Sequence, residues 1–244
     1  MGNKKLFISV ISILTALLIP VILFGFNFNS VAFNEDLYKK EFSKYDVYSD
    51  LRGYNVDDIN NKVLNYLRLS SGDELIDIDF FNEREKIHLL DVKTLIQSIF
   101  DVYYFSAILF VLLLIVLTYI MDFKIKNIAR KLFIILPAGS LLTLLVAVLF
   151  FALSSLDFNS AFDAFHKTFF SPGTYLFNSE FESIVVVYPE KLFLDLLVRT
   201  IFSIILSSGM LFFISATLFF VFFKRNFLNF FENFPSRKAK KQKL

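Results

Sequence analysis

The sequence of 244 residues contains no cysteine and no tryptophan, and only seven glycines and five prolines. Without cysteine the chain can form no disulfide, no thiolate metal site and no cysteine nucleophile. The glycines are scattered singly, which excludes a P-loop or a dinucleotide-binding turn. The motifs of serine hydrolases and zinc proteases, G-x-S-x-G and H-E-x-x-H, are also absent. The sequence thus lacks the common signatures of nucleotide, acyl-enzyme and zinc chemistry.

Apolar residues are what the chain has in excess. They make up 56% of it, and 34 residues are Phe, whereas soluble domains average about 45–50% apolar residues. Four uncharged runs are long enough to cross the roughly 30 Å core of a bilayer at about 1.5 Å per residue. The runs are Leu6–Phe26, Val102–Met121, Leu132–Ala152 and about Thr200–Phe223. The predicted fold class is therefore an all-α membrane protein with four transmembrane helices and two structured extracytoplasmic loops.

Lysine and arginine gather in three segments of the chain. The N-terminus, the link of residues 122–131 and the tail of residues 224–244 hold 13 basic residues against two acids. The other segments hold 12 basic and 21 acidic residues. Because basic segments stay on the cytoplasmic side of a membrane, we expect a multi-pass protein of the plasma membrane with both termini in the cytoplasm.

The apolar runs divide the chain into six predicted parts. These are a cytoplasmic N-terminus with transmembrane helix 1 (1–26), an extracytoplasmic segment (27–100), transmembrane helices 2 and 3 (101–152) with their cytoplasmic link (122–131), a second extracytoplasmic segment (153–199), transmembrane helix 4 (200–223) and a basic cytoplasmic tail (224–244). The first run is too long for a signal-peptide core and is followed by no A-x-A-like cleavage site, so we expect it to be a retained anchor.

The outward segments carry helical patterns. Apolar spacing predicts one helix from an Asn55 cap to about Leu69 and another that runs without a break from about Glu83 to Asp122. A third helical pattern covers Asp157–Phe170. The β-branched run Ile184–Val187 predicts a short strand or an interfacial stretch, so that a small strand element is part of the predicted fold.

The chain has two histidines, His88 and His166, and both fall in the outward segments close to a helix that enters the bilayer. Glu85 and Asp91 lie three residues before and after His88, so a helix places all three on one face. A neighbouring carboxylate can orient an imidazole and set its tautomer. The alternative is that each histidine is an ordinary surface residue. Acid-x-x-His pairs also occur in di-iron bundles, but the bridging carboxylates of such a core are lacking, so no metal is predicted.

Three motifs around these histidines resemble a known family. Residues 80–93 read FFNEREKIHLLDVK, and the second outward segment contains Phe162-x-x-Phe165-His166-x-x-Phe169-Phe170 and, later, Pro189-Glu190-x-x-Phe193-x-Asp195. Together with four membrane runs and two acidic outward segments, they resemble the lipoprotein intramolecular transacylase (Lit) family. The resemblance covers nearly the whole chain.

The resemblance implies a reaction on a bacterial lipoprotein whose N-terminal cysteine carries a diacylglyceryl group. The sn-2 acyl chain would move from the glycerol oxygen to the cysteine α-amine and give a lyso-form lipoprotein. The catalytic residues would be His88 and His166, one as general base and the other as general acid, without a cofactor. The implied partners are the diacylated lipoprotein and membrane lipids, with no nucleic acid.

Four charged residues complete the predicted site. Glu85 and Asp91 are expected to orient His88, and Arg84 or Lys93 to steady the oxyanion or a lipid headgroup. The competing interpretation is a non-enzymatic envelope protein that binds or senses a partner through an exported acidic domain. That interpretation explains the topology equally well, but it gives no reason for histidines beside two membrane boundaries. A transporter is disfavoured because the apolar runs contain no ionisable residue.

Overall fold

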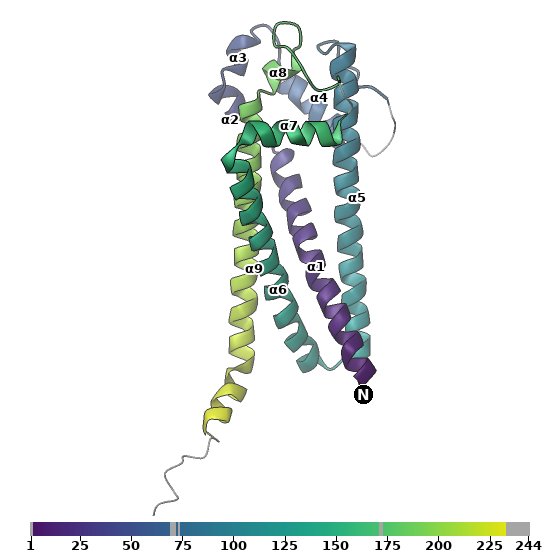
Figure 1. The fold of residues 1–244 in the computed structure, drawn as a ribbon, viewed down its shortest axis with the longest axis vertical. Helices are drawn as coiled ribbons and strands as arrows, with labels where there is room; N and C mark the ends of the chain where they lie inside the picture. Colours follow the sequence, from purple (N-terminus) through teal and green to yellow (C-terminus); the bar gives the residue numbers. More distant parts are fainter. Residues whose placement is uncertain (1, 69–71, 73, 171–172, 233–244) are drawn as a thin grey trace, which may run out of the picture.

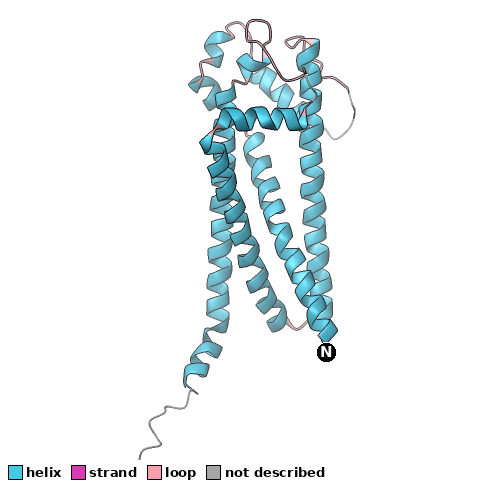
Figure 2. Cartoon of the chain, in the orientation of Figure 1, coloured by secondary structure: helices cyan, strands magenta, loops and turns pink. Residues whose placement is uncertain are grey.

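The computed structural model describes residues 2–68, 72, 74–170 and 173–232. Its elements, in chain order, are α1 (Gly2–Ala32), α2 (Glu35–Lys44), α3 (Val47–Asp50), α4 (Val56–Arg68), α5 (Glu83–Ile120), α6 (Ile125–Leu156), α7 (Phe158–Phe169), α8 (Ile184–Val187) and α9 (Glu190–Glu232). Figure 2 shows that helices joined by loops and turns account for these described residues. The all-α prediction is confirmed.

The long helices α1, α5, α6 and α9 form a bundle (Figure 1), with α6 against α9 and α1 against α5 and α6. Each contains a stretch long and apolar enough to cross a membrane. The unbroken helix predicted from about Glu83 is confirmed, because α5 runs to Ile120. Pro20 lies inside α1 and Pro137 inside α6, and both helices continue past them.

Two glycines let the bundle helices approach closely. A Cβ on Gly139 of α6 would lie 2.4 Å from Ile19 Cδ1 and 2.8 Å from the carbonyl oxygen of Ala16, both on α1. A Cβ on Gly25 of α1 would lie 2.6 Å from the ring of Tyr103 on α5. In lipid, where van der Waals contact replaces the hydrophobic effect between helices, such small residues set the packing distance.

One end of the bundle carries a folded cap, which we define as α2, α3, α4, α7, α8, the first turns of α5 and α9, and their connecting loops (Figure 1). The cap has its own hydrophobic core. Its most buried apolar side chains come from five different helices: Phe42, Val47, Val56, Val187 and Leu192, each no more than 2% exposed. Burying such a side chain stabilises a fold by about 1.5–3 kcal/mol, so the cap is a packed unit rather than a set of loose loops.

The predicted strand is wrong. Ile184–Val187 forms the single helical turn α8, in which the N–H groups of Val186 and Val187 donate to the carbonyl oxygen of Ser183 at 3.0 and 2.9 Å. The β-branched run is instead buried in the cap core, where Ile184 and Val187 are 6% and 0% exposed. Burial against helices satisfies these side chains without a partner strand, which overrides their strand propensity.

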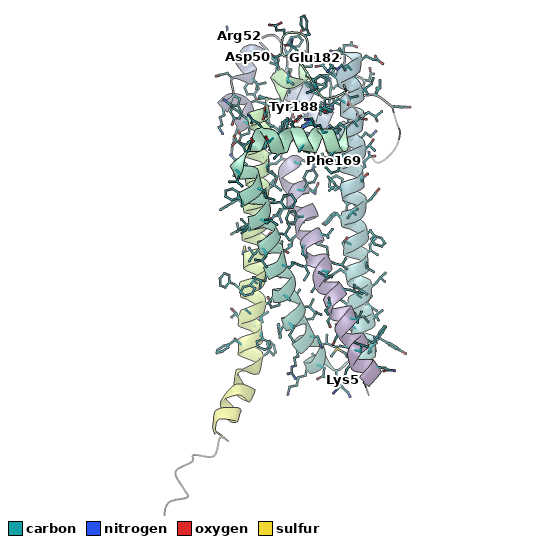
Figure 3. The ribbon with its side chains drawn as sticks, in the orientation of Figure 1. Lys5, Asp50, Arg52, Phe169, Glu182 and Tyr188 are labelled. Carbon is teal, nitrogen blue, oxygen red and sulfur yellow. The ribbon has the colours of Figure 1, made fainter. Side chains whose placement is uncertain are left out.

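The two ends of the bundle differ in charge. Figure 3 places Lys5 at the end opposite the cap, and Asp50, Arg52 and Glu182 in the cap. The link between α5 and α6 lies at the Lys5 end (Figure 1), and there Lys4 Nζ lies 3.4 Å from Asp122 Oδ2. The first residues of the predicted basic tail 224–244 continue α9, while residues 233–244 lie outside the described residues.

A polar network joins α2 to α9 at the edge of the cap. Glu41, 1% exposed, accepts a hydrogen bond from Arg199 Nη2 at 3.1 Å, and Asp195 accepts one from Tyr45 OH at 2.6 Å and pairs with Lys44. The second oxygen of Glu41, Oε2, is buried without a hydrogen-bond partner in the described part of the chain. Burial and the neighbouring Asp195 raise the pKa of the Glu41 carboxyl. The Lys44 and Arg199 cations, which both pair with Glu41, oppose this rise. The two carboxyl groups and the two cations thus form one network between α2 and α9.

This network predicts different outcomes for two isosteric substitutions. Glu41→Gln keeps an oxygen that can accept from Arg199 and replaces a carboxyl whose pKa is raised, so it should lower the melting temperature in detergent less than Asp195→Asn. Asp195→Asn removes the anion that Lys44 and Tyr45 bind, and should lower the melting temperature by roughly 3–8 °C. Thermal unfolding of the two variants beside the wild type measures both, and an equal loss for Glu41→Gln would contradict this ranking.

Candidate active site

The first turn of α5 is built around the buried carboxylate of Glu85. Asn82 Oδ1 accepts a hydrogen bond from the Glu85 N–H at 3.0 Å, and the Asn82 N–H donates to Glu85 Oε2 at 2.6 Å, which completes a capping box. The other oxygen, Oε1, accepts from the Ile184 N–H at 2.6 Å. Glu85 therefore joins the start of α5 to the start of α8. Both its oxygens bind backbone, so the geometry gives it no hydrogen bond to His88.

His88 follows three residues later on α5 and is 8% exposed. The edges of two aromatic rings enclose it, with centroids 4.9 Å away for Phe170 and 5.2 Å for Phe177. Its Nδ1 is buried without a hydrogen-bond partner among the described residues. The nitrogen left to face a substrate is therefore Nε2.

The environment of His88 keeps its ring neutral. Burial, followed by the nearby His166 and the Arg84 guanidinium, lowers the pKa of His88 from 6.5 to about 4. Each of these causes disfavours a second positive charge in an apolar site. The ring stands near the N-terminus of α5, where the helix dipole also disfavours a cation. It lies 14 residues before Val102, where the apolar run that can cross a bilayer begins.

His166 comes from α7, the helix that lies across the end of the bundle between α6 and α5 (Figure 1). Asp157 caps this helix, accepting from the Ser160 N–H at 3.1 Å. The half-buried His166 lies in the last turn, with Nδ1 2.7 Å from the carbonyl oxygen of Phe162. Because a carbonyl oxygen only accepts, Nδ1 carries the proton and Nε2 is free. The nearest acid in sequence, Asp163, pairs with Lys167 at 2.5 Å.

The two histidines meet at the junction of α5 and α7. Their ring centroids are 6.2 Å apart and their planes differ by 18°. Phe170 lies against both rings, and the Phe162 ring lies 4.2 Å from that of His166. In the described ranges no group of three or more His, Asp or Glu side chains lies close enough together to hold a metal ion. The arrangement can therefore exchange protons with a group held between two imidazoles.

Arg84 binds the segment of residues 173–182, which covers the site. Its guanidinium donates to Glu182 Oε1 at 2.6 Å, to the carbonyl oxygen of Gly173 at 3.0 Å and to that of Leu176. It also lies over the ring of Phe177, 4.9 Å from the centroid, and Phe177 is one of the rings on His88. Arg84 thus positions residues 173–182 through three of its five N–H donors.

Asp91 and Lys93 also make structural contacts near the site. Asp91 Oδ2 accepts a hydrogen bond from Thr174 Oγ1 at 3.3 Å, so it holds the same segment as Arg84. Lys93 is 3% exposed, donates to the carbonyl oxygen of Gly72 at 2.8 Å and lies 4.6 Å from the ring centroid of Tyr66. The geometry gives neither residue a hydrogen bond to a histidine, and Lys93 is too enclosed to meet a lipid headgroup.

Sequence reasoning missed the residues of the second segment that complete the site. Phe177 packs on His88, Tyr175 lies 5.4 Å from the His166 ring, and buried Glu182 binds Arg84. Arg84 and Glu182 are 98 positions apart in the chain, and no local spacing connects them. The aromatic richness of the segment was the only available signal.

The lowered pKa of His88 predicts a pH-dependent contribution to stability. The folded state binds fewer protons at His88 than the unfolded state between pH 6.5 and about 4, so this contribution is complete above pH 6.5 and is lost as the pH falls towards 4. The loss amounts to about 3 kcal/mol. Unfolding experiments between pH 7.5 and 4.5 should show a steeper loss for the wild type than for His88→Gln. Parallel curves for the two proteins would contradict it.

Comparisons with known proteins identify one family. The sequence profile of the family described as lipoprotein intramolecular transacylase Lit matches residues 13–193, a range that includes both histidines. A search among curated proteins finds no match. The solved structure of the membrane integral lipoprotein intramolecular transacylase Lit from Bacillus cereus has a TM-score of 0.74 at 19% identity, covering 93% of this chain and 100% of that one.

Two variants of the Bacillus cereus protein are similar to this chain as well, both at 19% identity. The variant with a histidine replaced by alanine has a TM-score of 0.72 and the variant with a histidine replaced by arginine 0.71, covering 93% and 94% of this chain and 98% and 100% of theirs. The solved structures show that the fold is shared, while the family profile spans most of the sequence. The chain belongs to the lipoprotein intramolecular transacylase (Lit) family.

Proposed function

We propose that this protein moves the sn-2 acyl chain of a diacylglyceryl lipoprotein to the α-amine of the lipoprotein's N-terminal cysteine, with His88 and His166 as base and acid. Membership in a transacylase family supports the enzymatic interpretation over a binding or sensing protein. The observation that carries the proposal is the meeting of the chain's two histidines, 6.2 Å apart, from helices that are remote in sequence.

The reaction exchanges an ester for an amide within one substrate. The amine nitrogen attacks the ester carbonyl, a C–N bond forms, the C–O bond to glycerol breaks, and one proton passes from nitrogen to the glycerol oxygen. An N-terminal amine has a pKa of about 7.7–8.0, so part of it is neutral at pH 7. Holding amine and ester together in one site can supply an effective molarity of roughly 10⁵–10⁸ M. The glycerol oxygen must still receive a proton, because an alkoxide is a poor leaving group.

The surroundings of each ring support an assignment of roles. His88 is buried, near a helix N-terminus and neutral at pH 7, so it is available to accept the proton of the attacking amine. His166 is half-buried in the C-terminal turn of α7, where a helix favours a cation. With Nδ1–H bound to the Phe162 carbonyl oxygen, a protonated His166 presents Nε2–H to the departing glycerol oxygen.

A single proton transfer from His88 to His166 returns both histidines to their starting protonation states. After transfer, His88 has gained one proton and His166 has lost one, so passing a proton from the first ring to the second restores both. A centroid separation of 6.2 Å is close enough for one bridging water to carry it. The lowered pKa of His88 favours this direction. The weak basicity of His88 therefore helps the cycle to close, although it makes the first proton transfer less favourable.

The site works on an exported substrate, so the cap should face outward. The distribution of basic residues supports this orientation, with Lys4, Lys5 and the link between α5 and α6 at the cytoplasmic end. The partners in this proposal are the diacylated lipoprotein and the lipids around it. Exposed Phe165 and Phe169 on α7 are suited to the membrane surface from which such a substrate would enter.

Replacing either histidine tests the chemistry. His88→Ala and His166→Ala should each lower formation of N-acylated lyso-lipoprotein by about 10²–10⁴-fold, the usual contribution of a positioned acid or base. Mass spectrometry of lipoprotein N-termini from a bacterial host lacking such an activity measures the product. The acyl chain should migrate to the amine without a change in total mass.

Thr168→Ala is the matched control, because Thr168 is exposed and lies two residues beyond His166 on α7. This variant should form product at the wild-type rate. Membrane levels and melting temperatures of all variants separate a loss of chemistry from a loss of folding. Wild-type turnover in both histidine variants would end the proposal.

The absence of cysteine makes the orientation directly testable. Ser179→Cys, in the cap, should react with a membrane-impermeant maleimide in intact cells. Asn127→Cys, at the opposite end of the bundle, should react only after permeabilisation. Since the parent chain contributes no background labelling, the reversed pattern would place the cap in the cytoplasm and exclude an exported substrate.

A further inference from the structure

A groove lies where α1, α2 and α9 meet at the boundary between the bundle and the cap. It has a volume of about 570 Å³ and shares no lining residue with the histidine pair. Val31 and Asn34 line it from the end of α1 and the following turn, α2 contributes Leu37 and Lys40, and α9 contributes Val198, Arg199 and Phe202. Asp36 is its one acidic residue. Nothing in the proposed acyl transfer uses this groove.

Two cationic side chains, Lys40 and Arg199, line it. Lys40, on α2, is exposed and forms no ion pair or hydrogen bond within the described part of the chain. Arg199, on α9, has a side chain that is 52% exposed and spends one guanidinium nitrogen on Glu41 at 3.1 Å. Asp36 lies 3.6 Å from Lys39, which offsets its charge. The groove is therefore left with a positive charge at its polar end.

The other end of the groove is apolar and exposed. Val198 and Phe202, one turn apart on α9, are 40% and 68% exposed, and the predicted membrane run begins between them at Thr200. One turn further along, Asn27 of α1 accepts from Ser203 at 2.6 Å and donates to Ser207 at 2.9 Å. These hydrogen bonds tie α1 to α9 beneath the groove. The opening thus stands at the height where lipid headgroups meet acyl chains.

We propose that this groove binds a phospholipid with a negatively charged headgroup, its phosphate between Lys40 and Arg199 and an acyl chain along Val198 and Phe202. Charge complementarity selects the headgroup, and the apolar wall at the start of the membrane run selects a lipid over a soluble anion. Guanidinium and ammonium groups are both suited to phosphate oxygens. The bound lipid joins α2 to α9 through Lys40 and Arg199.

The lipoprotein substrate fits this groove poorly. Its diacylglyceryl cysteine carries no phosphate, and its reacting end is an amine, which two cations would repel. The inference therefore concerns a lipid of the surrounding leaflet and is independent of the acyl-transfer chemistry. Its test leaves both histidines unchanged, so either proposal can fail alone.

Lys40→Gln and Lys191→Gln form a matched pair for the experiment. Each removes one exposed ammonium that has no ion pair in the described part of the chain, but only Lys40 lines the groove. The full-length proteins are placed in phosphatidylcholine nanodiscs with and without phosphatidylglycerol, and the retained lipid is counted by native mass spectrometry. A basic residue near a lipid surface contributes a factor of about five in affinity, so Lys40→Gln should retain phosphatidylglycerol about fivefold less tightly than the wild type.

The control variant and the melting experiments identify the molecule that binds in the groove. Lys191→Gln should match the wild type, which also accounts for the basic tail, since all three proteins carry it. Melting temperatures should rise with phosphatidylglycerol for the wild type and less for Lys40→Gln, and they should not rise with inorganic phosphate. Equal retention by Lys40→Gln and the wild type, equal retention of phosphatidylcholine, or stabilisation by inorganic phosphate alone would each overturn the proposal.

Discussion

The position of the candidate site depends on a single buried carboxylate. Glu85 is 1% exposed and accepts hydrogen bonds from the backbone of Asn82 and Ile184, which fixes the start of α5 against α8. Hydrogen bonds to a charged group contribute about 1.5–3 kcal/mol each, and losing a partner leaves a buried charge unsatisfied. His88 lies one turn further along α5, so the direction of its ring follows from this attachment. The capping box at the start of α5 thus helps to set the direction of the His88 ring.

The position of the His166 ring depends on a different set of contacts. His166 lies on a helix that crosses the end of the bundle, and the Phe162 carbonyl oxygen sets the direction of its ring. Arg84, from α5, then holds the backbone of residues 173–182, so the aromatic side chains of that segment close over both rings. The two histidines meet because three segments are held at one point: by a carboxylate, a carbonyl oxygen and a guanidinium.

Local features of this architecture could be predicted from the sequence, whereas its long-range contacts could not. The Asn55 cap, the helix beginning near Asp157 and the unbroken α5 are confirmed because caps and helical periodicity act within a few residues. The strand predicted at Ile184–Val187 is wrong because burial in a helical cap outweighed its propensity. For the site, the two histidines were identified by residue type. The distant partners of Glu85 and Arg84 could not be identified, since they lie 89 to 99 positions away along the chain.

The lack of a hydrogen-bond partner for His88 Nδ1 among the described residues helps to explain why such a site would favour an amine over water as the nucleophile. In hydrolases a carboxylate or carbonyl oxygen binds the far nitrogen of the histidine and strengthens it as a base, which is needed to activate a hydroxyl. Here Nδ1 of His88 is buried beside phenylalanine rings without such a partner in the described segments, and the pKa of the ring is lowered to about 4. A base this weak gives little help to water, whereas a neutral amine attacks an ester unaided and needs a proton acceptor only afterwards. The same apolar enclosure that weakens the base also excludes bulk water, so both effects act in favour of transfer and against hydrolysis.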